Sequence, residues 1–294
     1  MDIEKYLSII PVNEMYKDLF KPGMKKAGTA LETVIDGANL ILLPLKLLNA
    51  KSKVFFDNNL EKYSEKLNSE KVLTLTQVPQ YVGLPIIDKL TYLDQNELAE
   101  TFINLLTKAS FEETLKLVHP TYISILNNLS ADEAKILFHY KEHSAIPFID
   151  LYIHRYVETI QKPDENEPKT SASIKKLIDY TFQEKQDAYI KYAWNLTGIE
   201  NEVELIFPEN IDIYIENLQF NGLITYERKM HNKNDLPKYE RLLENDYSSI
   251  YQKLETELSN NDSDFKLEID IRKGYIEFTE LGKGFLDACI KDLA

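Results

Sequence analysis

The sequence predicts a mainly α-helical protein, with an N-terminal helical domain at residues 1–128 and an expanded winged-helix-like α+β domain at residues 129–294. Proline and glycine are scarce, with 11 and 9 residues in a chain of 294, which favours helices joined by short loops over a turn-rich β fold. Apolar residues recur at intervals of three and four along most of the chain, which is the spacing of one helix face. The second half alternates helical patterns with strand-like runs in the order of a winged helix, enlarged by insertions at about 158–200 and 230–265.

The N-terminal domain is predicted to consist of amphipathic helices. Residues 25–53 carry an apolar stripe at helical spacing, and Pro44 should kink or divide that helix. Residues 71–83 (KVLTLTQVPQYVG) contain β-branched residues and a proline, which predicts an extended connector or a short edge strand. The remaining elements predicted in this domain are helices at 54–67, at 84–93 with Pro85 in its first turn, at 96–109 and at 121–129.

The stretch KLVHPTYISILNNLSADEAKIL, residues 116–137, contains two successive helix starts. His119 precedes a proline, which steers its backbone away from the helical region, and Pro120 suits the first position of a new helix. Ser130 and Glu133 have the spacing of a capping box, in which each side chain bonds the other residue's backbone N–H. We therefore interpret His119 as a boundary between helices rather than a catalytic residue.

The second domain is predicted to combine short strands with helices. A strand is expected at 145–157, followed by an exposed polar loop at 161–173. A single long helix is expected at 174–196, and it contains Trp194, the only tryptophan. The later elements predicted are a helix at 208–221, a strand at 222–227, a helix at 236–258, a strand beginning near 275, and a final helix capped by Thr279.

The charge of the chain bears on its partners. Its 48 acidic residues exceed its 34 basic ones, giving a net charge of -14, which repels the phosphate backbone and disfavours nucleic-acid partners. The third helix of the predicted winged helix, ENIDIYIENLQFN, contains no lysine or arginine for phosphate contacts. The single cysteine, Cys289, excludes an intramolecular disulfide, and the N-terminus lacks the pattern of a secretory signal. We therefore expect a cytoplasmic protein.

The familiar catalytic motifs do not occur in the sequence, which has no HExxH, GxSxG, Walker-type loop, GxGxxG or CxxC. The best metal-like spacing is HYKEH, in which His139 and His143 share a helix face. No third ligand is evident nearby, and histidines in a last helical turn interact favourably with the helix dipole. We expect no catalytic residues, no cofactor, no metal and no enzymatic activity.

Residues 27–48 are the most apolar region, and the surrounding stretch 17–53 is rich in lysines. The uncharged run Gly37–Leu45 is too short to span a bilayer, and the apolar stripe matches a core helix packed on other helices. Lysines beside an amphipathic helix also attract a protein partner or an anionic membrane surface, and the stripe equally suits homo-oligomerisation. The residues expected at such a partner or membrane surface are Lys25, Lys26, Leu42, Leu45 and Lys46.

Six motifs stand in a characteristic order along residues 16–290: YKDLFKPGMKKAGTALETV, NLILLPLK, LPIIDKLTYLDQNELAETFINLL, VHPTYISILNNLSADEAKIL, NLQFNGLI and FTELGKGFLDACI. In this order and spacing the chain resembles the Abi-alpha family, a bacterial group associated with abortive infection. The resemblance implies a role in defence against bacteriophage, and it implies no catalytic residues.

Three functional hypotheses remain open from the sequence. The first is a non-enzymatic interaction protein that acts in phage defence on a protein partner or on a second copy of itself. The second is a membrane-acting effector that inserts the helix at 25–53. The third is a winged-helix transcription regulator, which the acidic helix at 208–221 disfavours.

Overall fold

The computed structural model describes residues 24–34, 50–94, 96–156, 170–184, 188–231, 235–259 and 266–293. This part of the chain is mainly helical, as the sequence predicts, and it contains one small four-stranded sheet. The chain forms two compact units, each assembled from separate stretches of sequence. Unit 1 comprises 1–143, 203–224 and 278–294, and unit 2 comprises 144–202 and 225–277.

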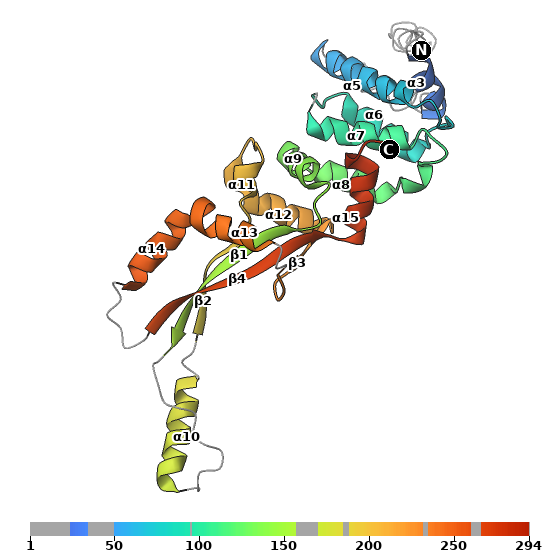
Figure 1. Ribbon diagram of the computed structural model, residues 1–294. Helices are drawn as coiled ribbons and strands as arrows, with labels where there is room; N and C mark the ends of the chain where they lie inside the picture. The colour runs from blue at the N-terminus through green and yellow to red at the C-terminus, as the bar shows by residue number, and fades with distance from the viewer. Residues whose placement is uncertain are drawn as a thin grey trace, which may run out of the picture. The chain divides into compact units, whose positions relative to one another are not determined.

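Unit 1 is built from helices. Those described are α3 (Lys25–Ala30), α5 (Ala50–Ser69), α6 (Gln80–Leu90), α7 (Glu97–Lys108), η3 (Leu115–Leu117), α8 (Pro120–Asn128), α9 (Ala131–Tyr140), η4 (Pro208–Asn210), α12 (Ile211–Phe220), α15 (Glu280–Phe285) and η7 (Leu286–Ile290). Helix α7 packs against α5, α6, α8, α9 and η7 (Figure 1). It is therefore the central element of this unit.

Helix α7 confirms the helix predicted at 96–109, but its burial extends beyond one face. The apolar residues Phe102, Leu105 and Leu106 are buried, and Leu98 is half-buried. The polar residues that are also buried are Thr101, Asn104, Thr107 and Lys108. The helix begins at Asn96, whose side chain accepts a hydrogen bond from the Ala99 N–H at 3.0 Å. A helix buried on most sides must satisfy these polar groups inside the protein.

The two helix starts predicted around residues 119–133 are confirmed. His119 is the N-cap of α8, and Pro120 occupies the first turn. Ser130 is the N-cap of α9, where its hydroxyl accepts from the Glu133 N–H at 3.3 Å and the Glu133 carboxylate accepts from the Ser130 N–H at 2.6 Å. Local sequence signals therefore set both starts.

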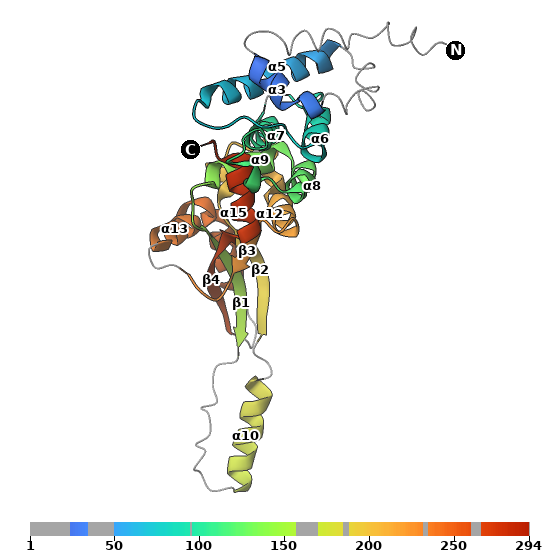
Figure 2. The same cartoon turned by 90° about the vertical axis from the view of Figure 1, so that its right-hand side faces the viewer.

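Unit 2 contains the sheet, in the strand order β2-β1-β4-β3. The strands are β1 (Ile146–Tyr156), β2 (Ala188–Leu196), β3 (Ile224–Glu227) and β4 (Lys266–Phe278). The helices of this unit are α10 (Ser171–Glu184), α11 (Ile199–Glu202), α13 (Leu236–Arg241), η6 (Leu242–Asp246) and α14 (Ser248–Ser259). Strand β1 pairs antiparallel with both β2 and β4, and the long β1 and β4 run side by side (Figure 2).

The core of unit 2 lies between the sheet and its helices. Ile149 and Leu151 of β1 are buried against Tyr239, Leu242 and Tyr247. Tyr239 lies in α13, Leu242 lies in η6, and Tyr247 directly follows η6. Burial of large apolar side chains at this face holds the helices against the sheet.

The single long helix predicted at 174–196 is wrong. The helix α10 ends at Glu184, and residues 188–196 form strand β2, with Trp194 on the strand. Strand β2 pairs with β1 through His154↔Tyr189 and Ile153↔Ile190. Aromatic and β-branched residues suit a paired strand, so long-range pairing overrides the helical spacing in this run.

Two helix boundaries also differ from prediction. Helix α6 begins at Gln80, just after Pro79, so Pro85 lies inside the helix rather than in its first turn. The helix predicted at 236–258 is divided into α13, the π-helical turn η6 and α14, with Tyr247 between the last two. The buried Tyr239, Leu242 and Tyr247 show that packing on the sheet sets this division.

Gly282 of α15 is required by a close backbone contact. A Cβ at this position would lie 2.0 Å from the Leu223 carbonyl oxygen, whereas a Cβ at Gly284 would meet only the end of the Tyr122 side chain. We expect Gly282→Ala to destabilise the protein by about 2 kcal/mol through overpacking, measured by urea denaturation. The control Gly284→Ala should be close to neutral because Tyr122 can shift and alanine favours helix. Equal effects of the two variants would contradict this account.

Candidate functional site

The lysine-flanked segment at 25–53 is described only in part. Helix α3 and its continuation bury Ala27, Leu31 and Val34. Lys25 is exposed, whereas the Lys26 Nζ donates to the carbonyl oxygens of Leu67 at 2.8 Å and Glu70 at 2.7 Å, at the end of α5.

The other residues predicted for this surface, Leu42, Leu45 and Lys46, lie outside the described residues. Across the helices that the structure does describe, none is both long and apolar enough to cross a bilayer. The partner or membrane surface at 25–53 therefore stays a prediction.

The histidines singled out by the sequence have local structural roles. The His119 Nδ1 accepts from the Thr121 N–H at 3.2 Å, which completes the cap of α8. His139 and His143 stack at the end of α9 with ring centroids 6.0 Å apart. Within the described ranges, no group of three or more His, Cys, Asp or Glu side chains is arranged to hold a metal ion.

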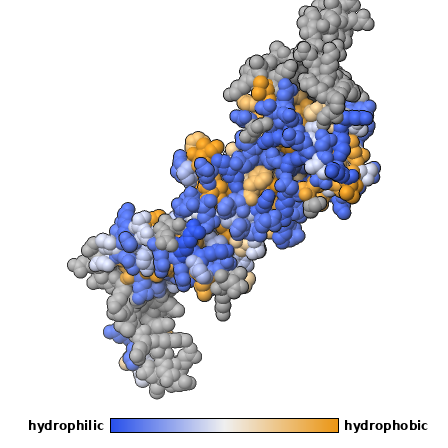
Figure 3. All heavy atoms as spheres, turned by 45° about the horizontal axis from the view of Figure 1, so that its top comes forward, coloured by the Kyte–Doolittle hydropathy of each residue, from blue (hydrophilic) through white to orange (hydrophobic). Residues whose placement is uncertain are grey.

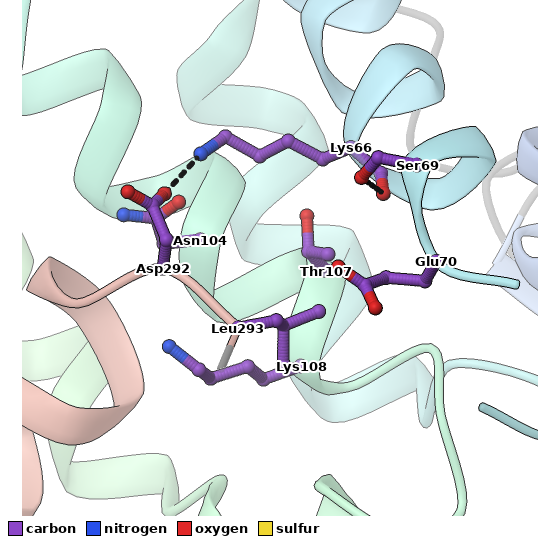
Figure 4. Close-up of a pocket in the computed structure, with 8 residues that line it drawn as sticks. All are labelled: Lys66, Ser69, Glu70, Asn104, Thr107, Lys108, Asp292 and Leu293. Carbon is purple, nitrogen blue, oxygen red and sulfur yellow. Dashed lines mark hydrogen bonds and ion pairs between the residues drawn. The ribbon is translucent and has the colours of Figure 1, made fainter. Parts of the chain in front are cut away.

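A polar hollow of about 260 Å³ lies beside α5 and α7 in unit 1 (Figure 4). It is lined by Lys66, Ser69, Glu70, Asn104, Thr107, Lys108, Asp292 and Leu293. The Lys66 ammonium lies 2.6 Å from the Glu100 carboxylate and 2.8 Å from the Asp292 carboxylate. The Asn104 amide donates to the Cys289 carbonyl at 3.1 Å, and the Lys108 Nζ donates to the Lys291 carbonyl. These bonds fasten the segment after η7 to α5 and α7.

The charges in the hollow are shifted by burial and by their partners. Burial lowers the pKa of Lys108 to about 8, because the loss of surrounding water disfavours the ammonium. Burial alone would lower the pKa of Lys66, but hydrogen bonds to Asp292 and Glu100 raise it. The hydrogen bond from Lys66 in turn lowers the pKa of Asp292. Lys66, Asn104 and Lys108 thus hold the residues from Cys289 to Asp292 against α5 and α7.

A second buried carboxylate, Asp132, organises the segment before α12. It is only 2% exposed and accepts backbone N–H bonds from Ile206 at 2.7 Å and Phe207 at 2.9 Å. The Tyr214 hydroxyl donates to the same carboxylate at 2.9 Å. Burial by itself would raise the pKa of Asp132, but these hydrogen bonds to the charged form bring it below its usual value. The backbone at Ile206 and Phe207 is thereby fixed from one side.

The outer side of this fixed segment exposes large apolar side chains. Ile206, Phe207, Ile213 and Phe220 are all more than half exposed, and Phe220 reaches 85%. Ile213 and Phe220 are seven residues apart and therefore share one face of α12. We call Ile206, Phe207, Glu209, Asp212, Ile213, Glu216 and Phe220 the α12 surface; all seven are exposed. Apolar patches of this kind stand out in a mainly hydrophilic surface (Figure 3).

The α12 surface was missed by the sequence interpretation, although a signal for it exists. The helix at 211–220 carries Ile213 and Phe220 opposite the buried Tyr214, Ile215 and Leu218. Apolar residues on both faces of a helix indicate that both faces make contacts. The role of Asp132 has no such signal, because its partners are more than 70 residues away in the chain.

Unit 2 contains a buried carboxylate, Asp150, on strand β1 of the sheet. The Arg228 guanidinium donates to Asp150 at 2.6 Å and to the Asn195 side chain at 2.7 Å, and it lies over the rings of Phe148 and Tyr226. Asp150 also accepts from the Asn195 N–H at 2.8 Å. This arrangement links β1, β2 and the residue after β3, and its groups satisfy one another.

Asp132 should contribute stability that depends on pH. Because its folded pKa is depressed, the contribution is present above about pH 4, the unfolded value, and is lost as the pH falls below it. We expect Asp132→Asn to be less stable than the wild type by about 2 kcal/mol at pH 7, with the difference shrinking at pH 3. Urea denaturation at both pH values measures this, with the exposed Asp212→Asn as control. A difference that is independent of pH would refute the assignment.

Lys108 should also make stability rise with pH, but in an alkaline range. Its folded pKa of about 8 lies below the unfolded value of about 10.4, so the folded state releases its proton first as the pH rises. Stability contributed by Lys108 therefore increases between these two values. We expect the wild type to gain stability relative to Lys108→Met from pH 7.5 to about pH 10, measured by urea denaturation. Parallel pH profiles would show that the amine is not desolvated.

Comparison with known proteins places the chain in a family. No significant match is found among curated proteins or among solved structures. The model of the family "abortive infection alpha" matches residues 55–289, which is most of the chain. This range includes α7, Asp132 and the whole of the α12 surface. The chain therefore belongs to the abortive infection alpha family, as its ordered motifs predict.

Proposed function

We propose that this protein acts in abortive infection as a non-enzymatic interaction protein and contacts its target through the α12 surface. The observation that carries the proposal is the pair of hydrogen bonds that the Asp132 carboxylate accepts from the backbone of Ile206 and Phe207, which we call the Asp132 clamp. A buried carboxylate fixes the backbone of Ile206 and Phe207 while both side chains face solvent. Burying a carboxylate is costly unless it is fully bonded, so a bonded carboxylate that holds apolar side chains outward is consistent with a binding surface.

The chemistry of the α12 surface favours a protein target. Exposed aromatic and aliphatic side chains such as Ile213 and Phe220, which share one helix face, are typical of protein–protein contacts. Glu209, Asp212 and Glu216 border the apolar residues, and residues 203–224 contain no lysine or arginine. Complementary charge at the rim of an interface speeds association and selects the partner. The surface therefore suits an apolar partner with basic flanks.

The same charges argue against the winged-helix transcription regulator. In that hypothesis α12 is the helix that would enter the DNA groove. Its exposed face carries Asp212 and Glu216, which the phosphate backbone repels. A protein target accommodates these carboxylates, whereas DNA does not.

The proposal is tested in bacteria challenged with phage, by scoring plaque formation and host viability. We expect the double variant Ile213→Ser/Phe220→Ser to lose at least about tenfold in plaque reduction, since interface residues of this type carry most of the binding energy. Its thermal unfolding should match the wild type because both side chains are exposed.

The matched control is Tyr81→Ser, which removes an exposed aromatic side chain from α6 of the same unit. This variant should keep full defensive activity. Undiminished defence by a folded Ile213→Ser/Phe220→Ser protein would rule out the α12 surface as the contact site.

A further inference from the structure

Helix α10 of unit 2 exposes an apolar stripe at its start. Ile174, Leu177 and Ile178 are 48%, 54% and 60% exposed. Residues three and four apart lie on one face of a helix, so these three side chains form a single stripe. Burying such a stripe against a partner would stabilise α10, because apolar surface leaves water.

The charge at the start of α10 is positive. Lys175 and Lys176 are exposed. Consecutive residues of a helix are rotated by about 100° around its axis, so Lys175 lies at the border of the stripe that contains Ile174. The first two turns contain no acidic residue, since acids enter the helix only at Asp179. This end of α10 therefore presents apolar side chains with basic neighbours.

The α12 surface has the complementary chemistry. Ile213 and Phe220 form its stripe on the helix, and Glu216 borders that stripe. One surface is apolar and basic, and the other is apolar and acidic. Every copy of the chain carries both, so a second copy offers each surface apolar side chains bordered by the opposite charge.

We propose that the start of α10 in one copy docks on the α12 surface of a second copy. Leu177 and its neighbours cover Ile213 and Phe220, and the lysines of α10 face Asp212 and Glu216. This docking rests on the proposed function only because both use the α12 surface. It identifies the partner of that surface as a second copy of the chain. An anionic membrane also attracts basic amphipathic helices, but it does not account for the acidic α12 surface.

Sedimentation equilibrium at low salt over a range of protein concentrations tests the docking. We expect reversible self-association of the wild type that weakens as salt screens the charges. The variants Lys175→Glu/Lys176→Glu and Asp212→Lys/Glu216→Lys should each weaken association at least about tenfold, because like charges then face each other. The chain carrying all four reversals should regain association, as should a mixture of the two double variants.

Lys229→Glu/Lys253→Glu is the control, since it changes the net charge equally at exposed positions elsewhere in unit 2. It should associate like the wild type. A wild type that stays monomeric, or reversals that do not rescue one another, would overturn the docking. Flotation with phosphatidylglycerol vesicles adds a second arm: binding by monomeric wild type that Lys175→Glu/Lys176→Glu abolishes would assign α10 to the membrane.

These results separate the two proposals. If Ile213→Ser/Phe220→Ser abolishes defence while the wild type is monomeric, the α12 surface binds a different protein and only the docking of α10 fails. If self-association depends on the α12 surface but defence does not, the docking stands and the proposed function fails.

Discussion

A helix buried on most of its sides constrains the whole of unit 1. Helix α7 places Asn104, Thr107 and Lys108 in the interior, and each polar group needs a partner there. Thr107 bonds the helix itself, through the Ile103 carbonyl. Asn104 and Lys108 instead donate to the carbonyls of Cys289, within η7, and of Lys291, directly after it, 185 and 183 residues further along the chain. The polar groups of one helix thus fix the position of the C-terminal segment.

The Asp132 clamp also shows a buried polar group that finds its partners inside the protein, but here the bonds position exposed residues. The carboxylate is satisfied from within by two backbone N–H groups and the Tyr214 hydroxyl. The residues it holds are apolar, yet they face outward. A buried polar network here shapes an exposed apolar surface, so the interior of unit 1 and its proposed contact site are physically coupled.

The sequence interpretation succeeded where structure is set locally. The caps at His119 and Ser130 and the helix at 211–220 depend on residues within a few positions of one another. It failed at 188–196, because a strand is stabilised by a partner far away in the chain. The α12 surface was missed for a related reason: exposure of Ile213 and Phe220 depends on which face of α12 meets its neighbours.

The sequence by itself determined the helix starts at Pro120 and Ala131, the mainly helical class, the acidic character and, through its ordered motifs, the family. These properties depend on short stretches of sequence or on amino-acid composition, and neither requires the folded structure. Only the tertiary structure decided which polar residues are buried together and which apolar residues remain outside. Those outcomes depend on contacts between distant segments, such as Asp132 with Ile206 and Phe207, and residue spacing does not say which distant segments meet.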